Sequence, residues 1–281
     1  MRRVRNILGI PMTGWLCAGA SGLILTLGFA PFSQPVAGWI GLIPIAYYGQ
    51  REQPDLRDAW VLGWFFGLSH FLTSLSWLQT VTISGWAVLS AYLAIYPGLW
   101  FVLWVRFSGS DPERMTSLGN IRHALLGASA WAVTEWLRGV VLSGFGWNSL
   151  GVSQGDLLLV AQVADLGGVA LVSWVVAFAG LTLTLTARRF ELEIRGAQKW
   201  RPRWDFTAGV IVVGMTMVYG ARTLLRPMPE PVLTLRYAAI QPSVPQDPWR
   251  SAKVSRVAEE LSKWSELALV GGGPVDLLVW P

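Results

Sequence analysis

The stretch LGGVALVSWVVAFAGLTLTLTA, residues 166–187, decides the fold class. It has 22 residues and no ionisable side chain. As an α-helix, with a rise of about 1.5 Å per residue, it would be about 33 Å long. The hydrocarbon core of a bilayer is about 30 Å thick, so the stretch is long and apolar enough to cross it. We therefore predict a membrane-spanning helix here.

Similar stretches recur along the chain and bring the predicted number of spans to about seven. They are residues 12–30, 36–50, 58–79, 85–106, 122–142, 166–187 and 206–224. The composition agrees, because 53% of the 281 residues are hydrophobic and only 14% are charged, about half the charged share of a typical soluble protein. We predict a polytopic α-helical membrane bundle that binds no nucleic acid, and we interpret the net charge of +5 as a signal of membrane orientation.

The segments between the predicted spans alternate in charge. One set carries fourteen basic residues, namely Arg2, Arg3, Arg5, Arg51, Arg57, Arg106, Arg114, Arg122, Arg188, Arg189, Arg195, Lys199, Arg201 and Arg203. The opposite loops, at about 31–35, 80–84 and 143–165, contain no Lys or Arg. Cytoplasmic loops hold the excess of basic residues, so we predict a cytoplasmic N-terminus. Seven spans then place everything after about residue 225 outside the cell membrane.

Tryptophan supports the predicted span ends, where amphipathic rings prefer the membrane interface. The side chains expected there are Trp15, Trp39, Trp60, Trp86, Trp104, Trp147 and Trp204.

The composition changes after the Pro-rich stretch 226–231, so we predict two domains, a transmembrane helical domain of residues 1–226 and a second domain of residues 227–281. In the second, residues 232–240 and 275–280 have the apolar content of buried strands, and 250–270 repeats apolar residues at helical spacing. Strand, helix and strand form the βαβ unit that opens an α/β domain with a largely parallel sheet. Two strands and one helix bury too little to be stable alone, so we expect this domain to be incomplete.

Ionisable side chains inside the spans are the candidates for function. Glu135 and Arg138 are three residues apart on one helical face. We expect either a structural ion pair, with Arg138 reaching outward to the interface, or an Arg138 that meets lipid phosphates. His70 belongs to a polar stripe that either packs on a neighbouring helix or lines a cavity. Asp165 is expected to cap the sixth span.

The loop 143–165 combines several glycines with Trp147 and contains no Lys or Arg. Such a loop either dips into the interface and lines a lateral opening, or is a plain connection. The lone Cys17 lies in the first apolar stretch, and one cysteine with two histidines gives no metal-site spacing. We therefore predict no catalytic residue, no metal site and no cofactor within these residues.

Several short motifs carry a resemblance to a known family. They are GFAPF (28–32), TEWLRG (134–139), SGFGW (143–147), SQ (153–154), IQP (240–242), VPQ (244–246), Trp249 and LLVWP (277–281). In this order, and in register with seven spans, the chain resembles the apolipoprotein N-acyltransferases of the bacterial inner membrane. Those enzymes carry a periplasmic domain of the nitrilase, or carbon–nitrogen hydrolase, type. The resemblance implies that residues 227–281 begin such a domain.

The resemblance also implies the reaction and the partners. An acyl chain leaves a phospholipid, is held as a thioester on Cys, and passes to the N-terminal diacylglyceryl-cysteine of a lipoprotein. The family's Glu acts as general base, Lys stabilises the oxyanion and Cys is the nucleophile. The family's Glu follows directly after the Trp-Pro at 280–281, so the triad is expected beyond these residues. We expect the chain to be a fragment of a longer reading frame, with half of a split or decayed gene as the alternative. We also expect it to be a monomer and inactive in acyl transfer by itself.

What remains in the chain is then the part that admits lipid. Arg138, Trp147 and Trp249 are the candidates for binding the phospholipid substrate. Two other classes of protein stay open from the residues alone. One is a non-catalytic membrane protein, transporter-like or scaffolding, with an external interaction module. The other is a membrane-tethered hydrolase of the same superfamily that acts on an amide.

Overall fold

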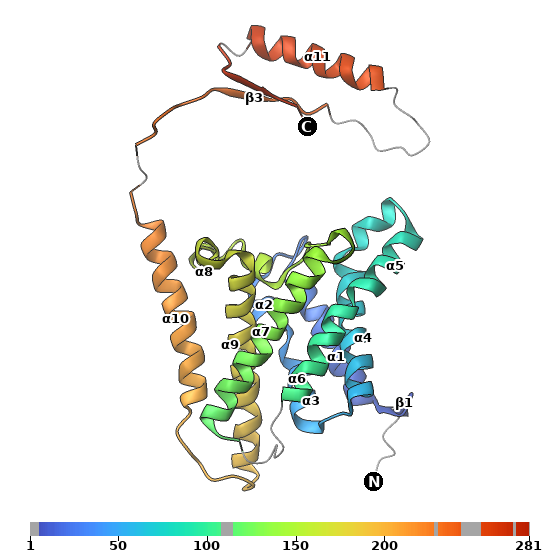
Figure 1. Ribbon diagram of the computed structural model, residues 1–281, viewed down its shortest axis with the longest axis vertical. Helices are drawn as coiled ribbons and strands as arrows, with labels where there is room; N and C mark the ends of the chain where they lie inside the picture. Colours follow the sequence, from blue (N-terminus) through green and yellow to red (C-terminus); the bar gives the residue numbers. More distant parts are fainter. Residues whose placement is uncertain (1–5, 108–114, 228–229, 243–253, 272–273, 281) are drawn as a thin grey trace. The chain divides into compact units, whose positions relative to one another are not determined.

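The chain is mostly helical, and its long helices gather into one bundle (Figure 1). The computed structural model describes residues 6–107, 115–227, 230–242, 254–271 and 274–280. The chain divides into two compact units, Met1–Arg226 and Pro227–Pro281. The elements of the first unit are β1 (Asn6–Ile7), β2 (Ile10–Pro11), α1 (Met12–Thr26), α2 (Pro35–Gly41), α3 (Ile43–Glu52), α4 (Leu56–Ser74), η1 (Ser76–Thr80), α5 (Ile83–Leu93), α6 (Ile95–Phe107), α7 (Ser117–Val140), η2 (Val141–Ser143), η3 (Leu150–Gln154), α8 (Leu158–Ala161), α9 (Ala164–Ile194) and α10 (Trp204–Leu224).

Three helical stretches are long and apolar enough to cross a membrane, judged by length and composition. They are Ile83–Phe107, Ala164–Ile194 and Trp204–Leu224. The apolar helix Met12–Thr26 is shorter. Each of the seven predicted spans falls on a helix or on two consecutive helices. The number of seven spans nevertheless stays a prediction.

Local sequence explains where several helices begin and break. The side chain of Asp55 accepts a hydrogen bond from the backbone N–H of Asp58 at 2.8 Å and so caps α4. Thr116 caps α7 in the same way. Pro44 and Pro97 lie just after the breaks between α2 and α3 and between α5 and α6. Proline has no N–H and clashes with the carbonyl four residues earlier, so it interrupts a helix.

Glycine lets α1 and α4 approach closely. A Cβ atom on Gly22 would lie 1.9 Å from the Ser69 hydroxyl oxygen and 2.6 Å from the backbone oxygen of Phe66. A Cβ atom on Gly14 would lie 2.8 Å from the ring of Tyr48 on α3. No larger residue fits at Gly22 without moving the α4 backbone, which is the close packing that small residues permit between membrane helices.

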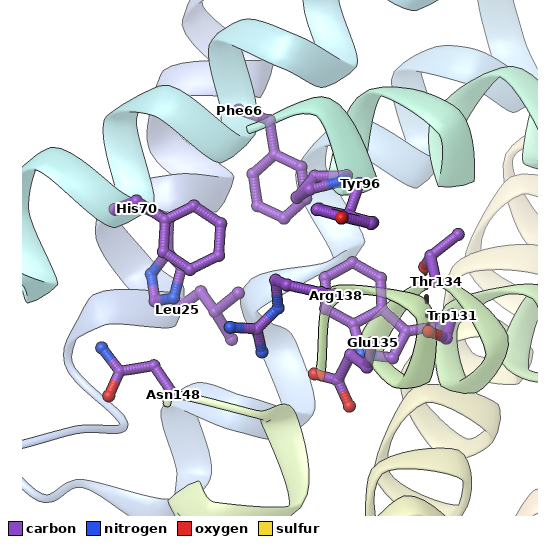
Figure 2. A pocket seen from close by; sticks show the side chains of 11 residues that line it. Leu25, Phe66, His70, Tyr96, Trp131, Thr134, Glu135, Arg138 and Asn148 are labelled. Atoms are coloured by element: carbon purple, nitrogen blue, oxygen red, sulfur yellow. Dashed lines mark hydrogen bonds between the residues drawn. The ribbon is translucent and has the colours of Figure 1, made fainter. Parts of the chain in front are cut away.

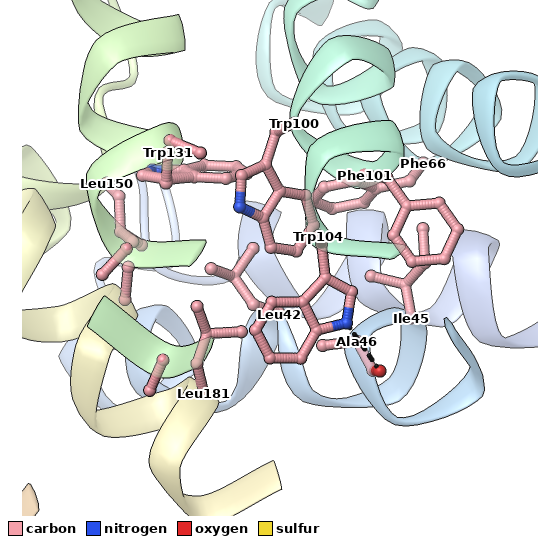
Figure 3. Close-up of a cluster of buried hydrophobic side chains, with 14 of the residues drawn as sticks. Leu42, Ile45, Ala46, Phe66, Trp100, Phe101, Trp104, Trp131, Leu150 and Leu181 are labelled. Carbon is pink, nitrogen blue, oxygen red and sulfur yellow. Dashed lines mark hydrogen bonds between the residues drawn. The ribbon is translucent and has the colours of Figure 1, made fainter. Parts of the chain in front are cut away.

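Aromatic side chains fill the centre of the bundle (Figure 3). Trp100 is fully buried and donates to the backbone oxygen of Gly127 at 3.0 Å. Its ring meets that of Trp131 edge-on, with ring centroids 5.0 Å apart. Trp104 was predicted at the membrane interface, and this was wrong. It is buried because its indole N–H donates to the backbone oxygen of Ala46 at 3.0 Å, which satisfies its one polar atom inside the core.

The connection between α9 and α10 corrects the predicted end of the sixth span. Helix α9 continues past residue 187 to Ile194, so Arg189 is helical and buried. Its guanidinium lies 3.1 Å from Glu193 and 3.5 Å from Asp205, the buried acid in the first turn of α10. Asn120 of α7 also donates to Asp205. Buried charges are tolerated when they are paired in this way, and here they join α7, α9 and α10.

The expected cap of the sixth span by Asp165 was also wrong. Helix α9 begins at Ala164, and residues Gly167 and Gly168 have non-helical backbone angles within it. Gly168 has φ +66°, which favours glycine. The carboxylate of Asp165 accepts hydrogen bonds from the Tyr219 hydroxyl of α10, at 2.7 and 2.9 Å, in place of a helix cap.

The second unit contains β3 (Tyr237–Ala239), α11 (Val254–Gly271) and β4 (Leu277–Val279). The two strands pair in parallel, Tyr237 with Leu277 and Ala239 with Val279. Both strands are shorter than the stretches 232–240 and 275–280 that the sequence predicted. The indole N–H of Trp280 donates to the Ser265 hydroxyl of α11 at 3.0 Å. The assignment of this unit to a nitrilase-like domain stays a prediction.

Candidate functional site around Arg138 and Trp147

The chain reverses direction sharply where α7 ends. Leu142, Ser143 and Gly144 have φ values of 52°, 68° and 78°. A Cβ atom on Gly144 would lie 2.0 Å from the backbone oxygen of Gly139, so only glycine fits this turn. The backbone N–H of Phe145 then donates to the backbone oxygen of Arg138 at 2.8 Å. The segment after the turn therefore folds back against the last turn of α7.

Arg138 anchors this segment through hydrogen bonds to its backbone. Its side chain is 2% exposed, and its guanidinium donates to the backbone oxygens of Phe145 at 2.9 Å and Trp147 at 2.5 Å. A third hydrogen bond reaches the Ser149 hydroxyl at 3.3 Å. The guanidinium also lies over the ring of Phe71, 5.3 Å from its centroid. In the described structure Arg138 points inward to the loop instead of reaching outward.

Glu135 holds the other end of the same segment. One of its carboxylate oxygens accepts from the backbone N–H of Leu150 at 2.6 Å. Glu135 and Arg138 do not approach within 4 Å as an ion pair in the described structure, so the expected salt bridge is not formed. Because both side chains form hydrogen bonds with the loop backbone, Arg138 and Glu135 together hold residues 145–150 in place.

A small cavity lies beneath this segment, between α1, α4, α6 and α7 (Figure 2). Its volume is about 20 Å³, room for about one water molecule. The lining includes His70, Tyr96, Glu135, Arg138 and Asn148. Figure 2 shows the Arg138 guanidinium extending from α7 into the space between His70 and Glu135. Polar side chains from helices far apart in the sequence thus meet under the loop.

His70 has both of the roles that its polar stripe allowed, packing on a neighbouring helix and lining a cavity. It is buried, and its Nδ1 atom lies 3.0 Å from the Thr26 hydroxyl of α1, which ties α4 to α1. The side chain lines the cavity, and its Nε2 atom is buried with no hydrogen-bond partner among the described residues. The second carboxylate oxygen of Glu135 is likewise buried without a hydrogen-bond partner among the described residues. The indole N–H of Trp131, which also lines the cavity, is buried without a partner in the described ranges as well. Three such polar groups around a cavity of this size suit a bound water or one small polar group.

Trp147 presents its indole at the surface of the loop. The side chain is 58% exposed, while its backbone oxygen is held by Arg138. The ring of Trp77, from η1, lies beside it with centroids 5.3 Å apart. Trp77 precedes Trp147 by 70 positions in the sequence, so no local pattern connects the two rings. The third predicted lipid-binding residue, Trp249, lies outside the described residues.

No nucleophilic constellation appears in the described part of the chain. Cys17 is half-buried in α1 and packs against the hydrophobic core. His123 stacks on Trp104, with ring centroids 3.9 Å apart, and does not reach the cavity. Within the described ranges, no three His, Cys, Asp or Glu side chains gather as a metal site requires. The described side chains of the site hold the loop and offer polar contacts to a ligand.

Comparison with known proteins shows consistent matches. Residues 21–182 match the family profile described as the apolipoprotein N-acyltransferase N-terminal domain. The apolipoprotein N-acyltransferase of Geobacter metallireducens is 32% identical over 99% of this chain and 53% of its own length. The proteins of the same name from Rhodopseudomonas palustris and Pseudomonas putida are 30% and 32% identical, over 95% and 97% of this chain and 52% of each relative. The chain spans about half the length of the curated relatives it matches.

Proposed function

Because the chain belongs to the apolipoprotein N-acyltransferase family, we propose that it forms the membrane-embedded, lipid-admitting part of such an enzyme. The reaction moves an acyl chain from a phospholipid to the N-terminal diacylglyceryl-cysteine of a lipoprotein. In this proposal the chain crosses the bacterial inner membrane seven times, with its N-terminus in the cytoplasm. Residues 227–281 then begin a nitrilase-like domain on the periplasmic side.

The charge pattern and the helices support this topology. The stretches 31–35, 80–84 and 143–165 contain no Lys or Arg. The loop held by Arg138 belongs to the last of them and therefore lies on the outer side in this topology. The end of α10 lies beside α8, because a Cβ atom on Gly220 would fall 1.9 Å from the backbone oxygen of Leu159. The chain thus leaves the bundle at the end where that loop is found.

The observation that carries the proposal is the exposed Trp147 on a rigidly anchored loop. An indole is amphipathic and prefers the level of the lipid headgroups. Arg138 and Glu135 hold the backbone on both sides of Trp147, so its ring is presented in one place. The pair of Trp147 and Trp77 offers flat apolar area beside which an acyl chain can enter. Arg138 acts here as a positioning residue, since its donors are engaged by the loop.

The acyl-transfer step itself is assigned to residues outside this chain. In the proposal a Glu, a Lys and a Cys follow Pro281. The thiolate attacks the ester carbonyl of the phospholipid, the acyl C–O bond breaks, the lysophospholipid leaves as a protonated alcohol, and the thioester intermediate forms. The acceptor amine then attacks the thioester and releases the thiol. In this proposal Cys17 is not the nucleophile, because it is half-buried in α1 and packs against the hydrophobic core.

Reading the gene in frame beyond codon 281 tests this assignment directly. We expect Glu as the next residue, then a Lys and a Cys within an α/β pattern, and one further apolar span. A stop codon with none of these residues downstream would contradict the proposed activity of this gene product.

A substitution tests the role of Trp147 in the enzyme encoded by the full reading frame. Trp147→Ala is expected to lower the rate of acyl transfer at least tenfold and to leave thermal unfolding unchanged, because the side chain is exposed. Trp136 on α7 is also largely exposed, at 62%, and Trp136→Ala serves as the matched control. Equal rates for the two variants would remove Trp147 from the site.

A further inference from the structure

Helix α10 approaches α9 closely at Gly209 and α8 at Gly220, and a groove lies between α9 and α10. A Cβ atom on Gly209 would lie 2.6 Å from the Thr182 hydroxyl, so the helices meet closely there. Near the other end α10 rests on α8 at Gly220. Only 17% of the residues in the apolar window of α10 are buried, against 50% for α9. One side of α10 packs on the bundle through residues such as Val212 and Thr216, and most of its other side chains lie open.

The groove is apolar and has a volume of about 350 Å³. Its walls include Leu183 of α9 and, on α10, Phe206, Val210, Val213 and Met217. The hydroxyl of Thr182, the polar side chain in the wall, donates to backbone oxygens of its own helix at 2.9 Å. The groove thus offers no free donor to a polar ligand, and its occupant must be apolar.

The length and volume of the groove suit an extended acyl chain as its occupant. From Phe206 to Met217 the groove follows twelve residues of α10, a length of about 16 Å at a rise of 1.5 Å per residue. One leaflet of the hydrocarbon core is about 15 Å thick, half of the full 30 Å. The groove therefore has the depth of one leaflet and an apolar volume of about 350 Å³, which suit an acyl chain.

The end of the groove at Phe206 carries positive charge. The connection 195–203 contains Arg195, Lys199, Arg201 and Arg203 and no Asp or Glu. Arg195 is paired with Glu191, and Arg203 with Glu193. Lys199 and Arg201 are exposed, and no ion pair of either appears within the described residues.

Two exposed indoles mark the same end of the groove. Trp200 and Trp204 are each 65% exposed, as expected for side chains at the headgroup level. A phosphate at this level would meet uncompensated positive charge.

We propose that the groove between α9 and α10 binds an acyl chain of an anionic phospholipid whose phosphate is held by Lys199 and Arg201. The charge pattern places this lipid in the cytoplasmic leaflet, at the opposite end of the bundle from Trp147. It is therefore a second lipid site, distinct from the one proposed for the acyl donor. The inference goes beyond acyl transfer and does not depend on it.

Native mass spectrometry of the full chain, released from detergent with added phosphatidylglycerol, tests the site. A Cβ atom on Gly214 meets nothing within 4 Å, so Gly214→Leu fills the groove without a clash. We expect this variant to retain phosphatidylglycerol at least tenfold less. Met215 is exposed, does not line the groove, and adds bulk outside it in the control Met215→Phe. Unchanged lipid retention in Gly214→Leu would overturn the proposal, as would a second protein chain retained in place of lipid.

The headgroup contact has its own variant. The double substitution Lys199→Glu and Arg201→Glu is expected to abolish the preference for phosphatidylglycerol over phosphatidylethanolamine, whereas Arg57→Glu, an exposed charge on α4, should keep it. Circular dichroism verifies that each variant is folded. If Gly214→Leu does not fold, the unaltered chain is cross-linked with phosphatidylglycerol that carries a diazirine on its acyl chain. Cross-links to Leu183 or to residues 206–217 support the site, and cross-links only elsewhere refute it.

Discussion

Replacing Arg138 by alanine would release the loop that carries Trp147. The guanidinium makes three hydrogen bonds to the loop, at 2.5, 2.9 and 3.3 Å, from a buried position. Hydrogen bonds to charged groups contribute about 1.5–3 kcal/mol each, and the three share one side chain, so we expect a loss of about 2–4 kcal/mol in the local stability of the loop. With tenfold per 1.4 kcal/mol, opening of the loop becomes roughly 30- to 700-fold more frequent.

Hydrogen–deuterium exchange of the chain in nanodiscs measures this opening. Peptides from 140–150 should exchange faster in Arg138→Ala, while peptides of α9 keep the exchange rates of the unaltered chain. Arg138→Lys should lie between, because an ammonium retains the charge but not the fork of donors that reaches several oxygens at once. Arg122 lies on the same helix with an exposed side chain, so Arg122→Ala is the matched control. If Arg138→Ala and Arg122→Ala exchange alike in 140–150, the loop is not held by Arg138 and the positioning argument fails.

Further predictions concern packing, buried charge and topology. Gly22→Ala should lower the free energy of unfolding by about 1–3 kcal/mol, because its Cβ atom would collide with the α4 backbone, whereas Gly19→Ala, which meets a ring at 3.4 Å, should change the melting temperature little. Asp205→Asn should cost about 2–4 kcal/mol in thermal unfolding, because it leaves a buried arginine with one fewer carboxylate, and the exposed Asp156→Asn should cost nothing measurable. A reporter that is active only in the periplasm should work when fused after residue 230 and fail when fused within the α9–α10 connection, and the reverse result would refute the proposed orientation.

Hydropathy predicts the positions of the helices well. A stretch such as 166–187 that crosses the hydrocarbon must be apolar and must pair its backbone hydrogen-bonding groups within its own helix. Hydropathy does not predict where α9 ends. The sequence places Arg189 in a cytoplasmic loop. In the structure it is buried, because Asp205, sixteen residues later, pairs with it. Trp104 fails for a similar reason, since the carbonyl that satisfies its indole belongs to Ala46 on another helix. Such partners come from tertiary contacts that a local pattern does not contain.

The candidate site shows the same division. The motif around Arg138 and the aromatic loop with Trp147 were both visible in the sequence, and they meet in the structure. Their relation was not visible, because spacing on α7 pointed to Glu135 as the partner of Arg138. The loop carbonyls compete successfully for the guanidinium, since the turn at Gly144 brings them back over α7. The contact between His70 and Thr26 joins residues 44 positions apart and has no local signal.

Mass spectrometry of a lipoprotein N-terminus tests the central claim most directly. Cells depleted of their own lipoprotein N-acyltransferase would express the full reading frame that contains this chain, and the N-terminal peptide of an abundant lipoprotein would be weighed. We predict a third acyl chain, linked as an amide to the N-terminal cysteine, on the peptide from these cells and not on that from cells with an empty vector. A peptide that carries only the diacylglyceryl group in both would contradict the account.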